Sequence, residues 1–190
     1  MSLTEPIRDR KQVRQFLAYY RSLGQTRNYL LATLCIHTAL RISDILLLRT
    51  NDVYDFESNR VRKTFTITER KTKKIKIVAL NKSAIAALTA YLPSAEPNSP
   101  LILNSKTGKA ISRIQAYRII RAAAEALNFS QRVSCHSLRK TFGYHACQDG
   151  VSLAVIMEIY NHSSFEVTRR YIGVNQDDKN AAYLGLDFTA

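Results

Sequence analysis

Residues 161–173, NHSSFEVTRRYIG, join a polar loop to a short amphipathic segment. The loop contains His162, and the segment runs through two arginines to Tyr171. Ser163 and Glu166 have the S-x-x-E spacing of a capping box, which predicts a helix that begins at Ser163. A lone tyrosine in such a helix is usually part of the core, whereas a tyrosine surrounded by basic groups can act as a nucleophile. The rest of the sequence helps to decide whether Tyr171 is a core residue or a nucleophile.

The chain carries a large surplus of positive charge. Its 190 residues include 28 Lys and Arg against 15 Asp and Glu, so the formal net charge is +13. This surplus exceeds what solubility requires and favours a polyanionic partner, most commonly nucleic acid. A membrane surface is the competing partner, but the sequence has no run of about 18 to 20 apolar residues that could span a bilayer.

The start of the sequence and its cysteines indicate a reducing environment. MSLTEPIRDRKQ lacks the apolar segment of a signal peptide. Cys35, Cys135 and Cys147 are odd in number and form no C-x-x-C pair, so neither a disulfide framework nor a structural zinc site is indicated. We expect a cytoplasmic, nucleoid-associated protein that uses no metal and no cofactor.

The spacing of apolar residues predicts helices along most of the chain. Residues 9–22 have the pattern of an amphipathic helix. Thr26 is expected to cap a second helix and Ser43 to begin a third through ILLLR, which places Arg41 at a helix-to-helix junction. Further helices are expected over residues 84–92, 112–127, 134–149 and 153–160, with a weaker one over 176–188.

The segment after the third predicted helix changes to alternating periodicity. Phe65 and Ile67 alternate with polar residues in one run, and Ile75 and Ile77 do so in the next. This pattern predicts a β-hairpin with the turn ERKTKK, which contains Lys71. We therefore expect a mainly α (α+β) fold, a helical domain over residues 1–190 with a small antiparallel β-sheet.

Several polar residues are suited to binding a phosphate. His136 and Arg139 lie three residues apart in HSLRKTFGYH, on one face of a predicted helix. Each candidate alone also has an ordinary interpretation. Arg41 could bind the carbonyls that end its helix, Lys71 could be part of a solvated turn, and His162 could be a loop histidine.

Taken in chain order, these residues resemble the catalytic domain of the tyrosine site-specific recombinases, a family that includes the phage integrases. TALRISDILLL resembles the first box of that family, with its arginine at Arg41 and its acidic residue at Asp44. RKTKKIKIVAL resembles the hairpin with the catalytic lysine, HSLRKTFGYH the H-x-L-R box, and YNHSSFEVTRRYIGV the last histidine box, with the tyrosine nine residues after the histidine. The resemblance extends from about residue 10 to the end. It implies a catalytic set of Arg41, Lys71, His136, Arg139, His162 and Tyr171, with Asp44 in support.

The resemblance also implies how the phosphodiester is activated. The scissile phosphate is anionic, so an attacking oxygen is repelled until the charge is neutralised. Arg41 and Arg139 would bind the phosphate oxygens, and His162 would add a third donor. Asp44 would orient neighbouring groups, as a buried acid beside Arg41 or His136 could.

By the same resemblance, Tyr171 attacks phosphorus and leaves a 3′-phosphotyrosine. Its phenol is neutral at pH 7 and must lose its proton as it attacks, with His136 as the candidate base. Lys71 would protonate the departing 5′ oxygen as general acid, although a shift in the hairpin alignment would exchange it with Lys73 or Lys74. The phosphotyrosine bond retains the energy of the cleaved bond, so a 5′ hydroxyl can rejoin the DNA without metal or ATP.

Three positions depart from the usual motifs of this family. Ala39 and Asn161 replace glycines, and Ala79 replaces a proline of the hairpin. None of these changes removes a reactive group. Asn161 also tolerates left-handed backbone geometry, so it could occupy a turn that is built for glycine.

The resemblance implies double-stranded DNA as the partner. It also implies a homo-tetramer on paired sites and, at some sites, an accessory DNA-bending protein. No membrane is involved. The C-terminal AAYLGLDF is either a segment that packs on another copy or a frayed tail. The N-terminal core-binding domain of larger relatives is not expected here, so the chain is either a small recombinase or a catalytic fragment.

Two rival functions share these features. A type IB topoisomerase uses the same chemistry to relax supercoils, although NHSSFEV reads more like the recombinase box. A DNA-binding regulator would keep the fold without turnover, but the complete candidate set argues against a decayed enzyme. A metal-dependent nuclease is disfavoured because no carboxylates cluster in the sequence as a two-metal site requires.

Overall fold

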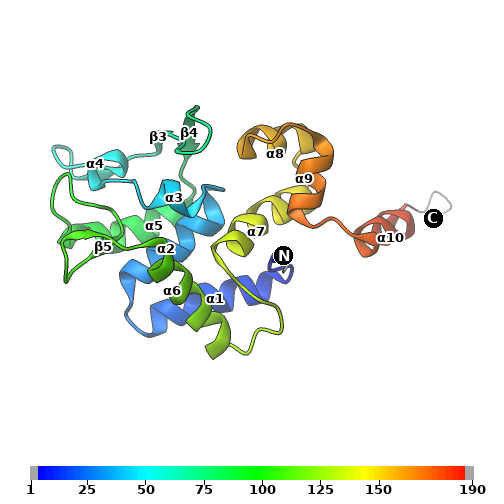
Figure 1. The fold of residues 1–190 in the computed structure, drawn as a ribbon, viewed down its shortest axis with the longest axis horizontal. Coiled ribbons are helices and arrows are strands. Elements are labelled where there is room, and N and C mark those ends of the chain that lie inside the picture. The colour runs from blue at the N-terminus through cyan, green and yellow to red at the C-terminus, as the bar shows by residue number, and fades with distance from the viewer. Residues whose placement is uncertain (1–3, 187–190) are drawn as a thin grey trace.

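The structure, a computed structural model, describes residues 4–186 and is mainly helical (Figure 1). No helix in this range has the length and apolar character needed to cross a bilayer. The helices are α1 (Arg10–Ser22), α2 (Thr26–His37), α3 (Ile42–Ile45), α4 (Thr50–Val53), α5 (Lys82–Tyr91), α6 (Arg113–Ala126), α7 (Cys135–Gln148), α8 (Leu153–Tyr160), α9 (Phe165–Ile172) and α10 (Gln176–Gly185), with the 3-10 helix η1 (Leu92–Ser94).

The strands form antiparallel pairs, which confirms the mainly helical α+β class. Where the sequence predicted one hairpin, the described chain contains three. The pairs are β1 (Tyr54–Asp55) with β2 (Arg60–Val61), β3 (Thr64–Thr68) with β4 (Ile75–Ala79), and β5 (Leu103–Asn104) with β6 (Lys109–Ala110).

The larger hydrophobic core is built around α2. This helix packs against α1, α5, α6 and α7. Its sequence LLATLCI, residues 30–36, is buried along its whole length, because neighbours cover the helix on several sides. Phe16 and Tyr20 of α1 contribute aromatic rings to this core in an edge-to-face arrangement.

A smaller core lies between α7, α8 and α9. It consists of Ala39, Ile156, Tyr160 and Ile172, all 0% exposed. Gly143 of α7 allows the close approach of α8 and α9, because a Cβ at this position would lie 2.5 Å from Tyr160 Oη and 2.6 Å from Ile172 Cγ2. This packing fixes the distance between α7 and the helix that carries Tyr171.

We predict that Gly143→Ala destabilises the protein by about 2 kcal/mol, because the added methyl group forces two packed helices apart. The free energy of unfolding from urea denaturation measures the effect. Gly185→Ala is the matched control, since a Cβ at Gly185 meets no atom within 4 Å. Equal stability of the two variants would contradict the assignment of Gly143 as a contact residue.

The β3–β4 hairpin is present, but β4 faces the opposite way from the prediction. Phe65, Ile67 and Val78 are buried, whereas Ile75 and Ile77 are 73% and 72% exposed. Both strands alternate, yet in β4 the apolar residues nearest the turn lie on the outer face. Periodicity identifies a strand without deciding which of its two faces the core covers.

Several predicted element boundaries also differ from the structure. Ser164, not Ser163, caps α9 by accepting from the backbone N–H of Val167. Thr26 lies inside α2 instead of capping it. The third helix ends at Ile45 instead of continuing through the leucines.

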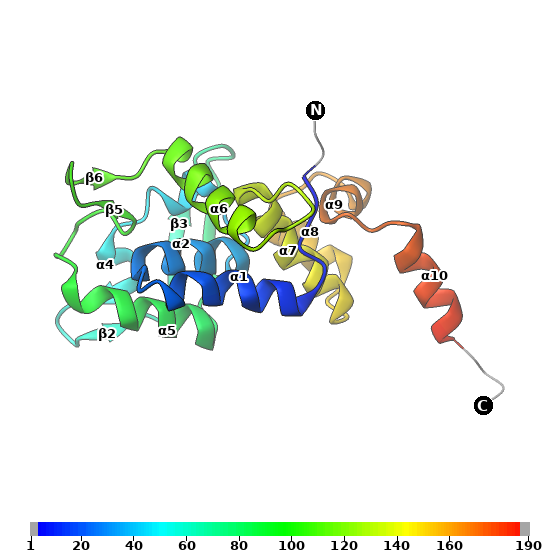
Figure 2. The ribbon, with the colours of Figure 1, turned by 90° about the horizontal axis from the view of Figure 1, so that it is seen from below.

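The N-terminal segment and the start of α10 both contact α7. Residues 4–8 cross this helix, where the backbone N–H of Ile7 donates to Thr141 Oγ1 at 2.9 Å. Arg8 then donates to the carbonyl of Gly173 and to the carboxylate of Asp178. From this contact α10 extends away from the body of the molecule (Figure 2).

Candidate active site

The predicted site residues converge where the β3–β4 hairpin faces α7 and α9. A cavity of about 490 Å³ is lined by Arg41, Lys71, His136 and Arg139. Tyr171 contacts His136 and Arg139, and the ring of His162 lies 4.9 Å from that of Tyr171 between centroids. Residues from positions 41 to 171 of the chain are thus brought together beside one basic cavity.

Arg139 is held rigidly at the centre of this site. It is 3% exposed, and its Nε donates to the carbonyl of Ala39 at 2.7 Å. Its Nη1 lies 3.2 Å from Tyr171 Oη, and the guanidinium stacks on the ring of Tyr160 at 4.6 Å. Ala39 has a left-handed φ of 55°, so this alanine keeps the backbone geometry of the glycine that it replaces.

Tyr171 presents its hydroxyl to the basic groups while its ring packs in the smaller core. Its Oη lies 3.4 Å from His136 Nδ1 and 3.2 Å from Arg139 Nη1. The ring meets Tyr160 edge to face at 5.2 Å. The two interpretations of this tyrosine are therefore compatible, because the ring packs in the core while the hydroxyl contacts two residues that line the cavity.

Both site histidines are held in the neutral form. Burial, with the charges of Arg139 and Arg41, lowers the pKa of His162 to about 4. Burial and the charge of Arg139 also lower the pKa of His136. A neutral His136 beside Tyr171 Oη is in the protonation state that a base requires.

The hydrogen bonds of His162 bear on its predicted role as a donor. Its Nδ1 lies 3.1 Å from Thr168 Oγ1, and that hydroxyl donates to the carbonyl of Ser164. The Thr168 oxygen therefore accepts from Nδ1–H, which leaves Nε2 of the neutral ring as an acceptor. For Nε2 to donate to a phosphate, the ring must gain a proton or the Thr168 hydroxyl must turn toward Nδ1.

The lowered pKa of His162 predicts a loss of stability in acid. The folded-state pKa is about 4 against an ordinary 6.5, so the unfolded chain binds more protons between these values. The free energy of unfolding should fall as pH drops from about 6.5 to about 4. Because the ring is partly exposed, we expect His162→Gln to remove about 1 kcal/mol of this fall. Urea denaturation of wild type and variant at pH 7 and pH 4.5 measures it, and equal losses in both proteins would contradict the prediction.

Glu69 is a site residue that the sequence analysis missed. It is 0% exposed and its Oε2 lies 3.0 Å from Arg41 Nη1. Asp44 is buried as expected, but its Oδ1 accepts from the backbone N–H of Arg70, not from Arg41 or His136. The acid that pairs with Arg41 therefore comes from the end of β3. In sequence its only signal is an acidic residue at the start of a basic turn.

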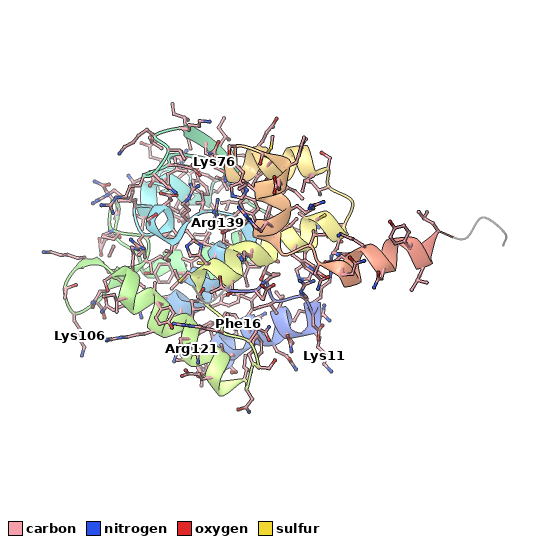
Figure 3. The ribbon with its side chains drawn as sticks, turned by 45° about the vertical axis from the view of Figure 1, so that its right-hand side comes forward. Lys11, Phe16, Lys76, Lys106, Arg121 and Arg139 are labelled. Carbon is pink, nitrogen blue, oxygen red and sulfur yellow. The ribbon has the colours of Figure 1, made fainter. Side chains whose placement is uncertain are left out.

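The hairpin lysines are placed differently from one another. All three lysines of the turn are exposed, but Lys71 lines the cavity, whereas Lys73 and Lys74 do not. Lys76 on β4 is partly buried and donates to the carbonyl of Ile159 at 2.7 Å. Burial lowers the pKa of Lys76 to about 8. Figure 3 shows Lys76 above Arg139, where the hairpin approaches α8 and α9. This arrangement favours Lys71 as the lysine that reaches a bound phosphate.

Comparison with known proteins places this site in a family. The profile of the phage integrase family matches residues 8–178. The chain belongs to the phage integrase family. It is 38% identical over 183 residues to the probable integrase/recombinase YoeC of Bacillus subtilis (strain 168), covering 96% of this chain and 97% of that protein. It is also 30% identical over 158 residues to a tyrosine recombinase of Pseudothermotoga lettingae, covering 83% of this chain and 53% of that one.

Solved structures of integrase-family proteins share the fold. The XerA recombinase matches with a TM-score of 0.79 at 21% identity, over 97% of this chain and 65% of that one. The XerH recombinase, bound to its difH substrate after cleavage, matches with a TM-score of 0.74 at 20% identity, over 92% and 51% of the chains. The chain thus spans about half to two thirds of these longer proteins.

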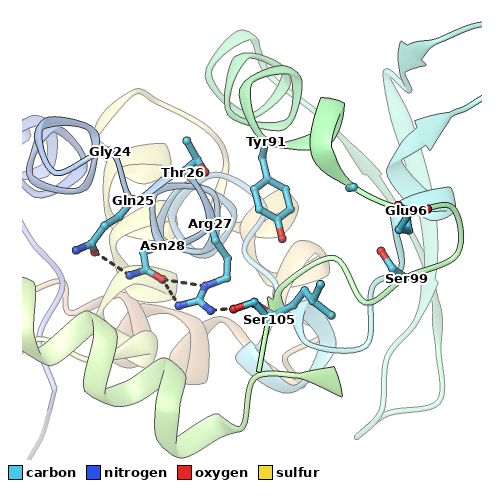
Figure 4. Close-up of a pocket in the computed structure, with 11 residues that line it drawn as sticks. Gly24, Gln25, Thr26, Arg27, Asn28, Tyr91, Glu96, Ser99 and Ser105 are labelled. Atoms are coloured by element: carbon cyan, nitrogen blue, oxygen red, sulfur yellow. Dashed lines mark hydrogen bonds between the residues drawn. The ribbon is translucent and has the colours of Figure 1, made fainter. Parts of the chain in front are cut away.

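A second cavity, of about 390 Å³, lies away from the candidate catalytic residues, between α2 and the loop after α5 (Figure 4). Arg27 lines this cavity and donates to Asn28 Oδ1 and to the carbonyl of Leu103. Asn28 in turn donates to Gln25 Oε1 at 2.8 Å. These polar groups serve the local structure, so the chemistry is expected at Tyr171.

Proposed function

We propose that this chain is a site-specific DNA recombinase or integrase that cleaves and rejoins DNA through a 3′-phosphotyrosine at Tyr171. The observation that carries the proposal is the position of Tyr171 Oη, within 3.4 Å of both His136 Nδ1 and Arg139 Nη1, two residues that line the same cavity as Arg41. A nucleophile, a base and two permanent cations around one space match the needs of phosphoryl transfer.

The arginines bind and activate the phosphate in this proposal. Arg139 has two of its nitrogens committed to backbone carbonyls, which leaves Nη1 directed at Tyr171 and the incoming phosphate. Arg41 approaches from the start of α3. The guanidinium charges of these two arginines stabilise the added negative charge of the transition state without a metal.

Proton transfer is assigned to the remaining groups. His136 accepts the phenolic proton of Tyr171 as the new O–P bond forms. Lys71, in the hairpin turn, donates a proton to the 5′ oxygen as the old P–O bond breaks. In the second step a 5′ hydroxyl attacks the phosphotyrosine, the same groups act in reverse, and no ATP is consumed.

The proposed partner is double-stranded DNA. Exposed basic residues lie on both sides of the cavity and would contact backbone phosphates, which gives salt-dependent and largely sequence-independent affinity. They are Arg70, Lys73 and Lys74 on the hairpin and Arg113 and Arg118 on α6. The DNA-bound state recorded for XerH supports this partner. We place the protein in the cytoplasm, at the nucleoid.

Strand exchange between two sites requires four active sites, so we propose a homo-tetramer on paired DNA sites, aided at some sites by a DNA-bending protein. Helix α10 is suited to contact another copy. Tyr183 and Leu184 on it are 79% and 85% exposed, and the part of the helix that carries them extends away from the body (Figure 2). The remainder of AAYLGLDF beyond residue 186 lies outside the described residues. We also propose that residues 1–190 form a single catalytic domain.

The test is to incubate the protein in EDTA with nicked duplexes from the flanks of its own gene, denature, and look for DNA attached to protein. A covalent adduct that maps by mass spectrometry to the peptide containing Tyr171 supports the proposal. Salt-sensitive binding with no adduct on any flank would instead favour a regulator. Relaxation of supercoiled plasmid without strand exchange would favour a topoisomerase.

A further inference from the structure

Glu69 joins three separate segments of the site through one oxygen. Its Oε2 accepts from Thr72 Oγ1 at 2.6 Å and from Asn161 Nδ2 at 2.9 Å, and it lies 3.0 Å from Arg41 Nη1. Thr72 follows Lys71 in the hairpin turn, and Asn161 precedes His162. A single buried carboxylate therefore contacts the immediate surroundings of three proposed catalytic residues.

This carboxylate is ionised in spite of its burial. Burial alone would raise the pKa of Glu69, but the hydrogen bonds from Thr72 and Asn161 and the charge of Arg41 together lower it below the usual value. A buried anion is costly unless its partners are well placed, and these three contacts offset the cost of burying the Glu69 carboxylate. Any motion of the hairpin or of the Asn161 loop would disturb the ion pair with Arg41.

The geometry at Asn161 supports a specific role for this contact. Asn161 has a left-handed φ of 54° and ends α8, the position where glycine is usual in the family motif. Glycine would adopt this backbone at lower cost, but it has no amide to donate to Glu69. The asparagine therefore adds a contact to the carboxylate that the glycine could not provide.

Arg41 depends on Glu69 for its direction. Its other polar contact in the described structure is a long one, 3.5 Å from Nη2 to the carbonyl of Tyr160. Arg139, in contrast, is fixed by the carbonyl of Ala39 at 2.7 Å and by two aromatic rings. Without the carboxylate, the guanidinium of Arg41 would be free to rotate away from the cavity.

We propose that Glu69 is a positioning residue that directs Arg41 toward the scissile phosphate. Through Thr72 and Asn161, Glu69 also holds the hairpin turn and the His162 loop in place next to Arg41. The inference rests on the proposed recombinase function. It assigns no proton transfer to Glu69, which acts on the phosphate only through Arg41.

The test compares Glu69→Gln with wild type on two duplexes, one with a normal phosphate and one with a neutral methylphosphonate at the scissile position. We expect adduct formation on the phosphate to slow by about 10- to 100-fold, and on the methylphosphonate by no more than about threefold, because a neutral group does not need Arg41. A merely structural role would slow both reactions equally, and that result would overturn the proposal. Glu125→Gln, at an exposed i,i+4 pair with Arg121, is the matched control.

Two further measurements keep the inference separate from folding and from the proposed function. If Glu69→Gln does not fold, Asn161→Gly removes one donor while keeping the left-handed backbone, and the same dependence on the phosphate charge is expected with a smaller loss. Nitrogen-15 NMR of the Arg41 guanidinium should show restricted rotation in wild type and free rotation in Glu69→Gln. Equal rotation in both would overturn the inference. If wild type forms no adduct, the proposed function fails, whereas the NMR comparison still decides whether Glu69 orients Arg41.

Discussion

Tyr171→Phe should abolish covalent attachment to DNA while leaving the fold and DNA binding nearly unchanged. The substitution removes only the Oη atom, whose contacts are Arg139 Nη1 at 3.2 Å and His136 Nδ1 at 3.4 Å. The ring keeps its packing against Tyr160 and His162. Without the nucleophile no phosphotyrosine can form, so we expect adduct formation to fall by at least about 10⁴-fold. Stability should change by no more than about 1 kcal/mol.

The measurement is the rate of adduct formation on a nicked duplex, together with the affinity for the intact duplex at fixed salt. Tyr54→Phe is the matched control, because its phenol on β1 donates to Asn59 and contacts none of the proposed catalytic residues. The prediction fails if the phenylalanine variant still attaches to DNA, which would move the nucleophile to another residue.

Arg139→Lys should be the most damaging change of a phosphate-binding residue. The guanidinium makes three directed contacts, to Ala39 O, Tyr160 O and Tyr171 Oη, and lysine cannot reproduce that fork. We expect adduct formation to slow by about 10²- to 10³-fold, as for loss of a donor that stabilises transition-state charge. Leaving a buried carbonyl unpaired should also cost about 1–3 kcal/mol of stability.

Rates are measured well below the melting temperature of the variant, so that unfolding does not contribute. Arg121→Lys provides the comparison, since Arg121 forms a partly exposed i,i+4 pair with Glu125, and we expect its loss to change stability by less than about 0.5 kcal/mol. A lysine variant as active as wild type would show that charge alone, without the fixed fork, is sufficient.

The fold class and the central site residues could be predicted from the sequence because they depend on local patterns. Helical periodicity located α1, α6 and α7, and the motifs placed His136 and Arg139 on one helix face. Gly143 shows where such patterns end. It reads as an ordinary helix residue, and its importance comes from Tyr160 and Ile172, which approach from other helices.

The parts that the sequence did not predict depend on tertiary contacts. The outward direction of Ile75 and Ile77 is set by which face of the hairpin the body covers, not by their alternation. Glu69 read as part of a solvated turn because its partners Arg41 and Asn161 lie 28 and 92 positions away. A buried ion pair between distant segments does not change the hydrophobic periodicity of either segment, so periodicity cannot reveal it.

The Arg8 contacts connect the N-terminal segment mechanically to Gly173 and to the start of α10. Arg8 binds Gly173, two residues beyond Tyr171, and also Asp178 of α10, while Ile7 is anchored to α7. A pulling force between residue 4 and α10 would therefore load these contacts before it reached α2 and the larger core. Arg8 would be loaded first, and once its link to Asp178 separated, the tension would pass through Gly173 to the short helix that carries Tyr171 before it reached the larger core.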